Sequence, residues 1–119
     1  MNILIADDEI ETIEMLKNRL SCKGHIVDTA SIGDKALDLI KSNRYDLVFV
    51  DHNMPELTGI ELIKYIKENS LKAKTVMITG YLSISDFGAK AVGADEYLTK
   101  PIMIEEIEEV IEKYWYCQK

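Results

Sequence analysis

Short, wholly apolar runs alternate along this chain with segments in which apolar residues recur every three or four positions, and this alternation constrains the fold most. The apolar runs cover residues 3–6, 26–27, 47–50, 76–78 and, more weakly, 97–98. Strands that are apolar on both faces are typical of a parallel sheet covered by helices on both sides. The sequence therefore predicts an α/β protein in which strands and helices alternate roughly five times.

Stripes of apolar residues at helical spacing indicate the predicted helices. Four stripes stand out: Ile10, Ile13, Leu16 and Leu20; Ala36, Leu37 and Ile40; Ile60, Ile63 and Ile66; and Ile104, Ile107, Ile111 and Tyr114. A further segment, 83–92, is a poorer helix prediction because Gly88 lies within it. Right-handed crossovers then give a doubly wound sheet, and the stripes are interpreted as core rather than as a cofactor site.

Three local signals predict helix ends. Thr58, followed three residues later by Glu61, has the form of a capping box before the third stripe. Ser31 is expected to cap the second helix, and Gly24 is expected to end the first.

Length and charge narrow the function classes. The chain has 119 residues, which suits one domain spanning 1–119. Its 14 Lys and Arg against 21 Asp and Glu give a net charge of −7, which argues against nucleic acid or an anionic membrane as a partner. The aliphatic runs are far shorter than the ~20 residues that span a bilayer, and no leader is recognised. Cys22 and Cys117 give no readable disulfide framework, so a cytoplasmic location is expected.

Polar and charged residues follow four of the apolar runs. Ligands of open α/β sheets bind beyond the carboxyl ends of the strands, so these residues are expected to share one edge. They are Asp7, Asp8 and Glu9 after the first run, Asp51 after the third, Thr79 after the fourth, and Lys100 with Pro101 after the fifth.

Each of these residues has a structural alternative. Asp8 with Glu11 could simply cap the first helix. Taken singly, Thr79 could be an ordinary strand-end hydroxyl and Lys100 a solvated lysine. Asp51 follows four apolar residues at the margin of the core, where an ionised carboxylate is costly unless paired. The functional interpretation depends on all of them meeting.

A cluster of this kind favours phosphoryl chemistry. Carboxylates at close range ionise together only if a cation compensates, and oxygen ligands in an open cleft suit Mg²⁺. A lysine and a hydroxyl beside the metal would neutralise and position a phosphoryl group, and a carboxylate could accept it as an acyl phosphate. The sequence shows no zinc-type His/Cys spacing, glycine-rich phosphate loop after the first run, or G-x-S-x-G motif.

Four motifs in order resemble those of the receiver domain, the phospho-acceptor module of bacterial two-component response regulators, over essentially the whole chain. They are 3–9 (ILIADDE), 51–55 (DHNMP) with Gly59, 78–80 (ITG) and 93–101 (GADEYLTKP). The resemblance implies a flavodoxin-like, five-stranded parallel sheet of order 2-1-3-4-5 with helices on both faces.

The resemblance also implies a role for each acidic residue. Asp51 would be the phosphorylated aspartate. Asp7 and Asp8 would hold Mg²⁺, or Mn²⁺, together with Asp51 and the backbone carbonyl of Asn53. His52 is interpreted as a bystander, because its side chain should point away from Asp51.

The remaining implied roles concern the phosphoryl group and the switch. Thr79 and Lys100 would each contact a phosphoryl oxygen, and Lys100–Pro101 would be a cis peptide. Tyr97 would be the aromatic residue that turns inward when Thr79 moves. The segment from Thr79 to Lys100 is one residue shorter than the usual pattern, which leaves the coupling of Tyr97 to the surface open.

The implied partners are a sensor histidine kinase or a histidine phosphotransfer protein, and a downstream protein or output domain, with no direct contact of this domain with nucleic acid or membrane. The domain would catalyse only its own phosphorylation and dephosphorylation. A weak homodimer stays open, although five glutamates between 105 and 112 disfavour a salt-bridged one.

Three rival functions are weighed against this one. An aspartyl-nucleophile phosphatase needs a second acid two residues after Asp51, where this chain has Asn53. In a flavin carrier the carboxylates of 7–9 would repel the flavin phosphate. A receiver-shaped interaction module that is never phosphorylated is the remaining alternative.

Overall fold

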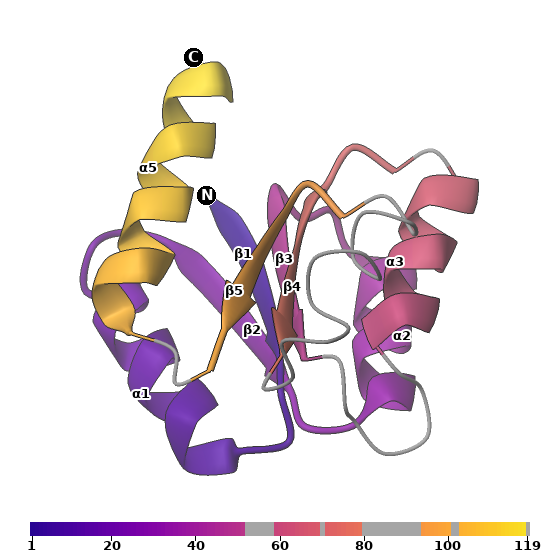
Figure 1. Ribbon diagram of the computed structural model, residues 1–119, viewed down its shortest axis with the longest axis horizontal. Helices are drawn as coiled ribbons and strands as arrows, with labels where there is room; N and C mark the ends of the chain where they lie inside the picture. The colour runs from indigo at the N-terminus through magenta and orange to yellow at the C-terminus, as the bar shows by residue number, and fades with distance from the viewer. Residues whose placement is uncertain (52–58, 70, 80–93, 101–102, 119) are drawn as a thin grey trace.

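Five parallel strands form one sheet in the computed structural model, which describes residues 1–51, 59–69, 71–79, 94–100 and 103–118 (Figure 1). The strands are β1 (Asn2–Ala6), β2 (Ile26–Ala30), β3 (Leu47–Asp51), β4 (Lys74–Thr79) and β5 (Glu96–Thr99). Their order in the sheet is β2-β1-β3-β4-β5. The predicted fold class and strand order are confirmed.

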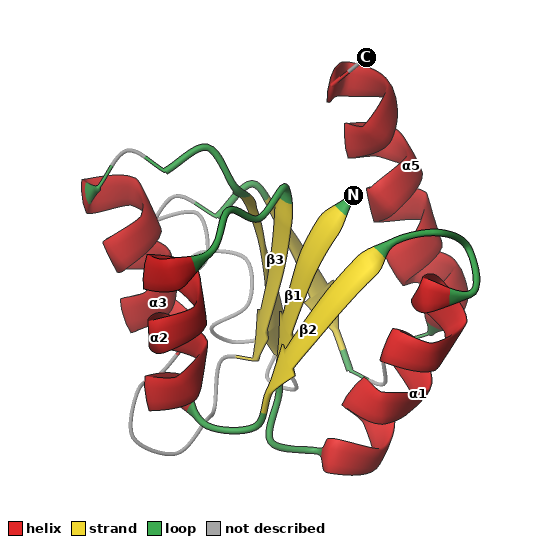
Figure 2. Ribbon diagram, turned by 180° about the vertical axis from the view of Figure 1, so that it is seen from behind, coloured by secondary structure: helices red, strands yellow, loops and turns green. Residues whose placement is uncertain are grey.

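Helices cover both faces of the sheet, as the sequence predicts. They are α1 (Ile10–Ser21), α2 (Gly33–Ser42), α3 (Gly59–Glu68) and α5 (Ile104–Gln118). Figure 2 shows α1 and α5 on one side of the strands and α2 and α3 on the other. None of these described helices is long and apolar enough to cross a membrane. The helix predicted over 83–92 lies outside the described residues.

Alternate residues of each strand point into two separate apolar cores. The core under α1 and α5 contains Ile3, Ile5, Leu47, Phe49, Val76 and Ile78 from the strands. The core under α2 and α3 contains Leu4, Ala6, Val48, Val50 and Met77. The predicted stripes supply the helical side of both cores, with one correction: Ile10 is 60% exposed. It stands at the first position of α1, before the helix packs on the sheet.

The predicted cap at Ser31 is wrong, and Asp8 does not take the capping role considered for it as an alternative. The N-cap residues are Glu9 for α1 and Ile32 for α2, in place of Asp8 and Ser31, and neither makes a side-chain capping bond to the described residues. Gly24 does follow α1, with a φ of 93° that suits glycine, and its N–H donates to the Ser21 carbonyl oxygen at 3.0 Å. The capping box at Thr58 lies outside the described residues.

The register of the sheet brings the ends of distant segments together. Ala6 of β1 pairs with Val50 of β3, so the next residue of each strand, Asp7 and Asp51, emerges at the same edge. Further along the same edge, Thr79 of β4 pairs with Thr99 of β5, the residue before Lys100. The carboxyl ends of four strands therefore meet along one edge.

Burial of the central strands should dominate stability. Ile5 in β1 is fully buried, whereas Ile26 in edge strand β2 is 67% exposed. We expect Ile5→Ala to lower the free energy of unfolding by about 2–5 kcal/mol, because it leaves a cavity in the core. The same substitution at Ile26 should cost less than about 1 kcal/mol. Urea denaturation of both variants checks this, and similar losses at the two positions would contradict the assigned burial.

Candidate functional site

Three aspartates form a compact acidic cluster at the carboxyl edge of the sheet. One ligand oxygen from each of Asp7, Asp8 and Asp51 lies within 4.8 Å of the others. Asp7 follows β1 and Asp51 ends β3, and these two side chains are buried, whereas Asp8 is exposed. The convergence predicted from the sequence is therefore present in the fold.

The loop after β1 fixes the Asp7 carboxylate and leaves one of its oxygens available. The Asp7 N–H donates to the Ala30 carbonyl oxygen at 3.0 Å, and Oδ1 accepts the Glu9 N–H at 2.9 Å. Oδ2 is buried and has no hydrogen-bond partner among the residues that the structure describes. Such an oxygen is costly to bury, so it is a natural position for a cation ligand.

Burial also perturbs the protonation of Asp7. It raises the pKa of the Asp7 carboxyl from 3.8 to about 7. The hydrogen bond from the Glu9 N–H opposes this rise, the charge of Asp51 adds to it, and Lys100 opposes it. Burial has the largest effect, so without a divalent cation the Asp7 carboxyl is partly protonated near neutral pH, because its pKa is about 7.

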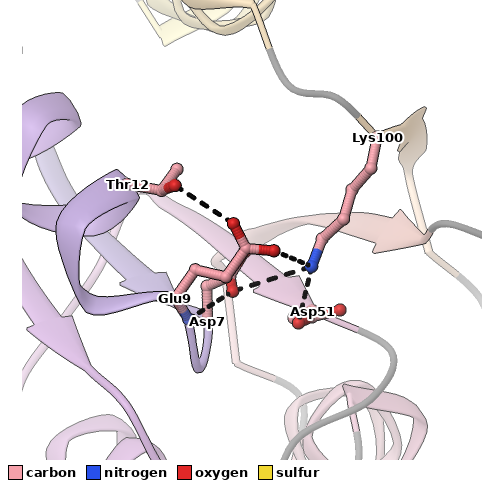
Figure 3. A network of polar contacts seen from close by, with 5 residues as sticks. All are labelled: Asp7, Glu9, Thr12, Asp51 and Lys100. Carbon is pink, nitrogen blue, oxygen red and sulfur yellow. Dashed lines mark hydrogen bonds and ion pairs between the residues drawn. The ribbon is translucent and has the colours of Figure 1, made fainter.

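Lys100 supplies a positive charge from the end of β5. Its Nζ lies 3.1 Å from Asp51 Oδ2, 3.2 Å from Glu9 Oε1 and 3.8 Å from Asp7 Oδ1, as Figure 3 shows. Burial lowers the pKa of this ammonium, but the hydrogen bond and charge of Asp51, with further help from Asp7 and Glu9, raise it above its ordinary value. Lys100 therefore stays charged.

The donor set fits a hard divalent cation. Among the residues that the structure describes, four carboxylates (Asp7, Asp8, Glu9 and Asp51) lie around one ammonium, so the fully ionised cluster carries excess negative charge. Mg²⁺ prefers oxygen ligands, binds through one or two carboxylates and keeps several waters. The buried free oxygen of Asp7 and the exposed Asp8 give such an ion one protein-facing and one solvent-facing ligand.

The other predicted site residues have different outcomes. Thr79 ends β4, so its backbone lies at this edge, although the structure does not describe its side chain. Tyr97 lies in β5, where it is partly buried and packs against the core under α2 and α3. His52, Asn53 and Pro101 lie outside the described residues.

Glu9 is the third carboxylate of the segment after the first apolar run, but no role was predicted for it or for Thr12 from the sequence. Glu9 Oε1 contacts Lys100, and Thr12 Oγ1 donates a hydrogen bond to Glu9 Oε2 at 3.2 Å (Figure 3). The i, i+3 spacing of Glu9 and Thr12 in a predicted first helical turn was the available signal.

Fold and site together define a class of protein: a doubly wound parallel α/β sheet with an acidic carboxyl edge whose oxygens could hold a cation. A family model for the response regulator receiver domain matches residues 3–112. The chain belongs to this family, whose members are signalling modules rather than classical enzymes. The family resemblance seen in the sequence is confirmed.

Relatives and solved structures agree with this assignment. Response regulator MprA of Mycobacterium sp. (strain KMS) is 37% identical over 108 residues, which are 90% of this chain and 47% of that protein. The chain thus spans about half the length of the curated relatives it matches. The receiver domain of Francisella response regulator 1452 is 29% identical with a TM-score of 0.89, over 99% of this chain and 98% of that one.

One solved relative is described with ligands. Response regulator TrrA of Thermotoga maritima, in complex with Mg²⁺-BeF, is 36% identical with a TM-score of 0.83, over 95% of this chain and 97% of that one.

The raised pKa of Asp7 makes stability depend on pH. Between about pH 4 and 7 the folded protein binds more protons at Asp7 than the unfolded chain, so stability without divalent metal should fall as pH rises through this window. Asp7→Asn cannot ionise, so it should flatten this slope and be more stable than the wild type at pH 8 by roughly 2–4 kcal/mol.

Urea denaturation in EDTA from pH 4.5 to pH 8 measures this dependence. Asp38→Asn, which removes an exposed carboxylate from α2, is the matched control and should keep the wild-type slope. A wild-type slope in Asp7→Asn would show that Asp7 titrates normally.

Proposed function

We propose that residues 1–119 form a single receiver domain that accepts a phosphoryl group on Asp51. The donor would be a phosphohistidine of a sensor histidine kinase or a histidine phosphotransfer protein. The observation that carries the proposal is the contact between Lys100 Nζ and Asp51 Oδ2 inside the acidic cluster. The TrrA structure with Mg²⁺-BeF supports it, because that relative shares the fold and more than a third of its residues.

Asp51 is the nucleophile in this proposal. One of its carboxylate oxygens forms a bond to phosphorus while the bond from phosphorus to the donor imidazole nitrogen breaks, and the imidazole leaves. Asp51 is suited to this step because it stands at the strand end, held by Lys100, with its side chain 3% exposed.

Charge neutralisation comes from the surrounding groups. Asp7, Asp8, Asp51 and the Asn53 carbonyl would hold Mg²⁺ or Mn²⁺, which supplies positive charge to the phosphoryl oxygens. Lys100 remains charged beside Asp51 and balances the additional negative charge that phosphorylation brings. Thr79, at the end of the neighbouring strand, would donate its hydroxyl hydrogen to another phosphoryl oxygen.

In this proposal a conformational switch couples Thr79 to Tyr97. The two residues lie in paired strands, where Thr79 is opposite Thr99 and Met77 is opposite Tyr97. Tyr97 is partly buried against the core under α2 and α3, and in this proposal it turns further inward when Thr79 is drawn toward the phosphoryl group. The Lys100–Pro101 cis peptide belongs to the same proposal.

The proposed output lies outside this domain. The relatives are about twice as long, so the signal would pass to a further domain or to a separate protein. The net charge of −7 disfavours direct nucleic-acid contact by this domain. Apart from its own phosphorylation and dephosphorylation the domain would catalyse no reaction, and it would act in the cytoplasm.

Phosphorylation of Asp51 is tested by labelling with acetyl phosphate and Mg²⁺. The wild type should take up about one phosphoryl group per chain, and Asp51→Ala should take up none, because it removes the proposed nucleophile, whose Oδ2 lies 3.1 Å from Lys100 Nζ. Asp46→Asn, at the amino end of the same strand, is the control and should label normally. Stoichiometric labelling of Asp51→Ala would refute the assignment, and an unlabelled wild type would favour an interaction module that is never phosphorylated.

Lys100 should be needed for the transfer and not for metal binding. We expect Lys100→Met to slow labelling about 100-fold at saturating Mg²⁺, because it removes a charge that stabilises the transferring group. Lys72→Met, which removes an exposed lysine far from this edge, should label at the wild-type rate. A labelling rate for Lys100→Met within threefold of the wild type would contradict the role given to Lys100.

A further inference from the structure

We propose that Glu9 is a positioning residue that holds the Lys100 ammonium at the mouth of the acidic cluster, so that Lys100 competes less with the divalent cation for the carboxylates of Asp7 and Asp51. The inference rests on the proposed function, because it concerns how the same site receives its metal. It assigns a role to Glu9, the most exposed of the three carboxylates that contact Lys100.

The three carboxylates around Lys100 differ sharply in exposure. The Glu9 side chain is 58% exposed, whereas those of Asp7 and Asp51 are 1% and 3% exposed. Lys100, at 25%, lies on the boundary between them. Its ammonium contacts Glu9 and Asp51 at nearly equal distances and stands 3.8 Å from Asp7. Glu9 is therefore the contact on the solvent side.

Glu9 is itself held in place from two sides. Its two carboxylate oxygens have different partners, because Oε1 contacts Lys100 and Oε2 accepts the hydrogen bond of Thr12 Oγ1 (Figure 3). Its backbone N–H is bonded to Asp7 Oδ1. An exposed ion pair usually loses much of its gain to side-chain entropy, and these restraints reduce that loss. The side chain makes no capping bond to the described part of α1, so capping does not explain its position.

The hold on Lys100 has a consequence for metal binding. An ammonium and a divalent cation compete for the same oxygens, since each is attracted to Asp51 and Asp7 and repels the other. Without the Glu9 charge, the buried carboxylates of Asp7 and Asp51 are the remaining partners of Lys100 among the described residues, and Lys100 is drawn further toward them. The cation then has to displace Lys100 from both of them, and its affinity falls.

A simpler effect acts in the same direction. Removing any negative charge near the cluster weakens cation binding through space, whatever Lys100 does. A double-mutant cycle separates the two effects. The effect of Glu9 on the position of Lys100 disappears when Lys100 is replaced, whereas the through-space effect of the Glu9 charge on the cation remains.

The experiment measures Mg²⁺ binding by isothermal titration calorimetry at constant ionic strength. The proteins are the wild type, Glu9→Gln, Lys100→Met and the double variant. We expect Glu9→Gln to weaken Mg²⁺ binding about fivefold in the wild-type background, and Lys100→Met to strengthen it. In the Lys100→Met background Glu9→Gln should change the dissociation constant by less than twofold. Glu11→Gln, which removes an exposed charge from the same helical turn, is the matched control and should also stay below twofold.

Two milder variants keep the test decisive if Lys100→Met does not fold. Glu9→Asp retains the charge but is too short to reach both Lys100 and Thr12, so it should weaken Mg²⁺ binding about threefold. Thr12→Val removes the donor to Glu9 Oε2 and should weaken binding about twofold.

The outcomes separate the two proposals. Equal losses on Glu9→Gln in both backgrounds, or a wild-type affinity in Glu9→Asp, would overturn the hold on Lys100 while leaving the phospho-acceptor function intact. A wild type that binds no Mg²⁺ and takes up no phosphoryl group would overturn the proposed function, and the positioning role with it.

Discussion

Two carboxylates buried at the ends of central strands, balanced by one ammonium, are the constraint on which this molecule depends. Asp7 and Asp51 are buried because β1 and β3 lie inside the sheet and helices cover both of its faces. Burying ionised groups is unfavourable, and the apolar cores on both faces must offset that cost. The sheet thus concentrates negative charge where its own geometry excludes water, and a cation relieves the resulting repulsion.

Perturbed protonation alone would not identify this edge. Burial and a hydrogen bond to Asp28 also raise the pKa of Tyr45, yet that pair is self-contained, with the Tyr45 hydroxyl 2.7 Å from its acceptor. The acidic edge differs in two ways. Asp7 Oδ2 has no hydrogen-bond partner among the described residues, and Lys100 is shared by three carboxylates. The hydrogen bond between Tyr45 and Asp28 satisfies that pair, whereas the acidic cluster would be completed by an added cation, as proposed above.

The sequence predicted the strands and the site edge for a physical reason. Apolar runs at the centre of a parallel sheet define strands, and residues that follow them in parallel strands must share an edge, so Asp7 and Asp51 could be placed together. The predicted cap at Ser31 was wrong, and the alternative cap at Asp8 is not found, because the backbone enters each helix one residue later. Glu9 and Lys100 were predicted to share this edge, but the contact between their side chains depends on rotamers that the order of residues does not determine.

The distribution of burial indicates where a change at Asp51 could be accommodated. All five residues of β3 are buried, as are four of the five in β1, so these strands cannot shift without opening both cores. Every residue of β5 is only partly buried. Because β5 pairs with β4 and leads into Lys100, groups drawn toward a phosphoryl oxygen would act on the least restrained of the strands that reach the site. A switch of the proposed kind requires a rigid part and a part that can move. Here β1 and β3 support Asp51 rigidly, whereas β5 is less restrained, so the charge of a phosphoryl group could shift β5 without disturbing the central strands.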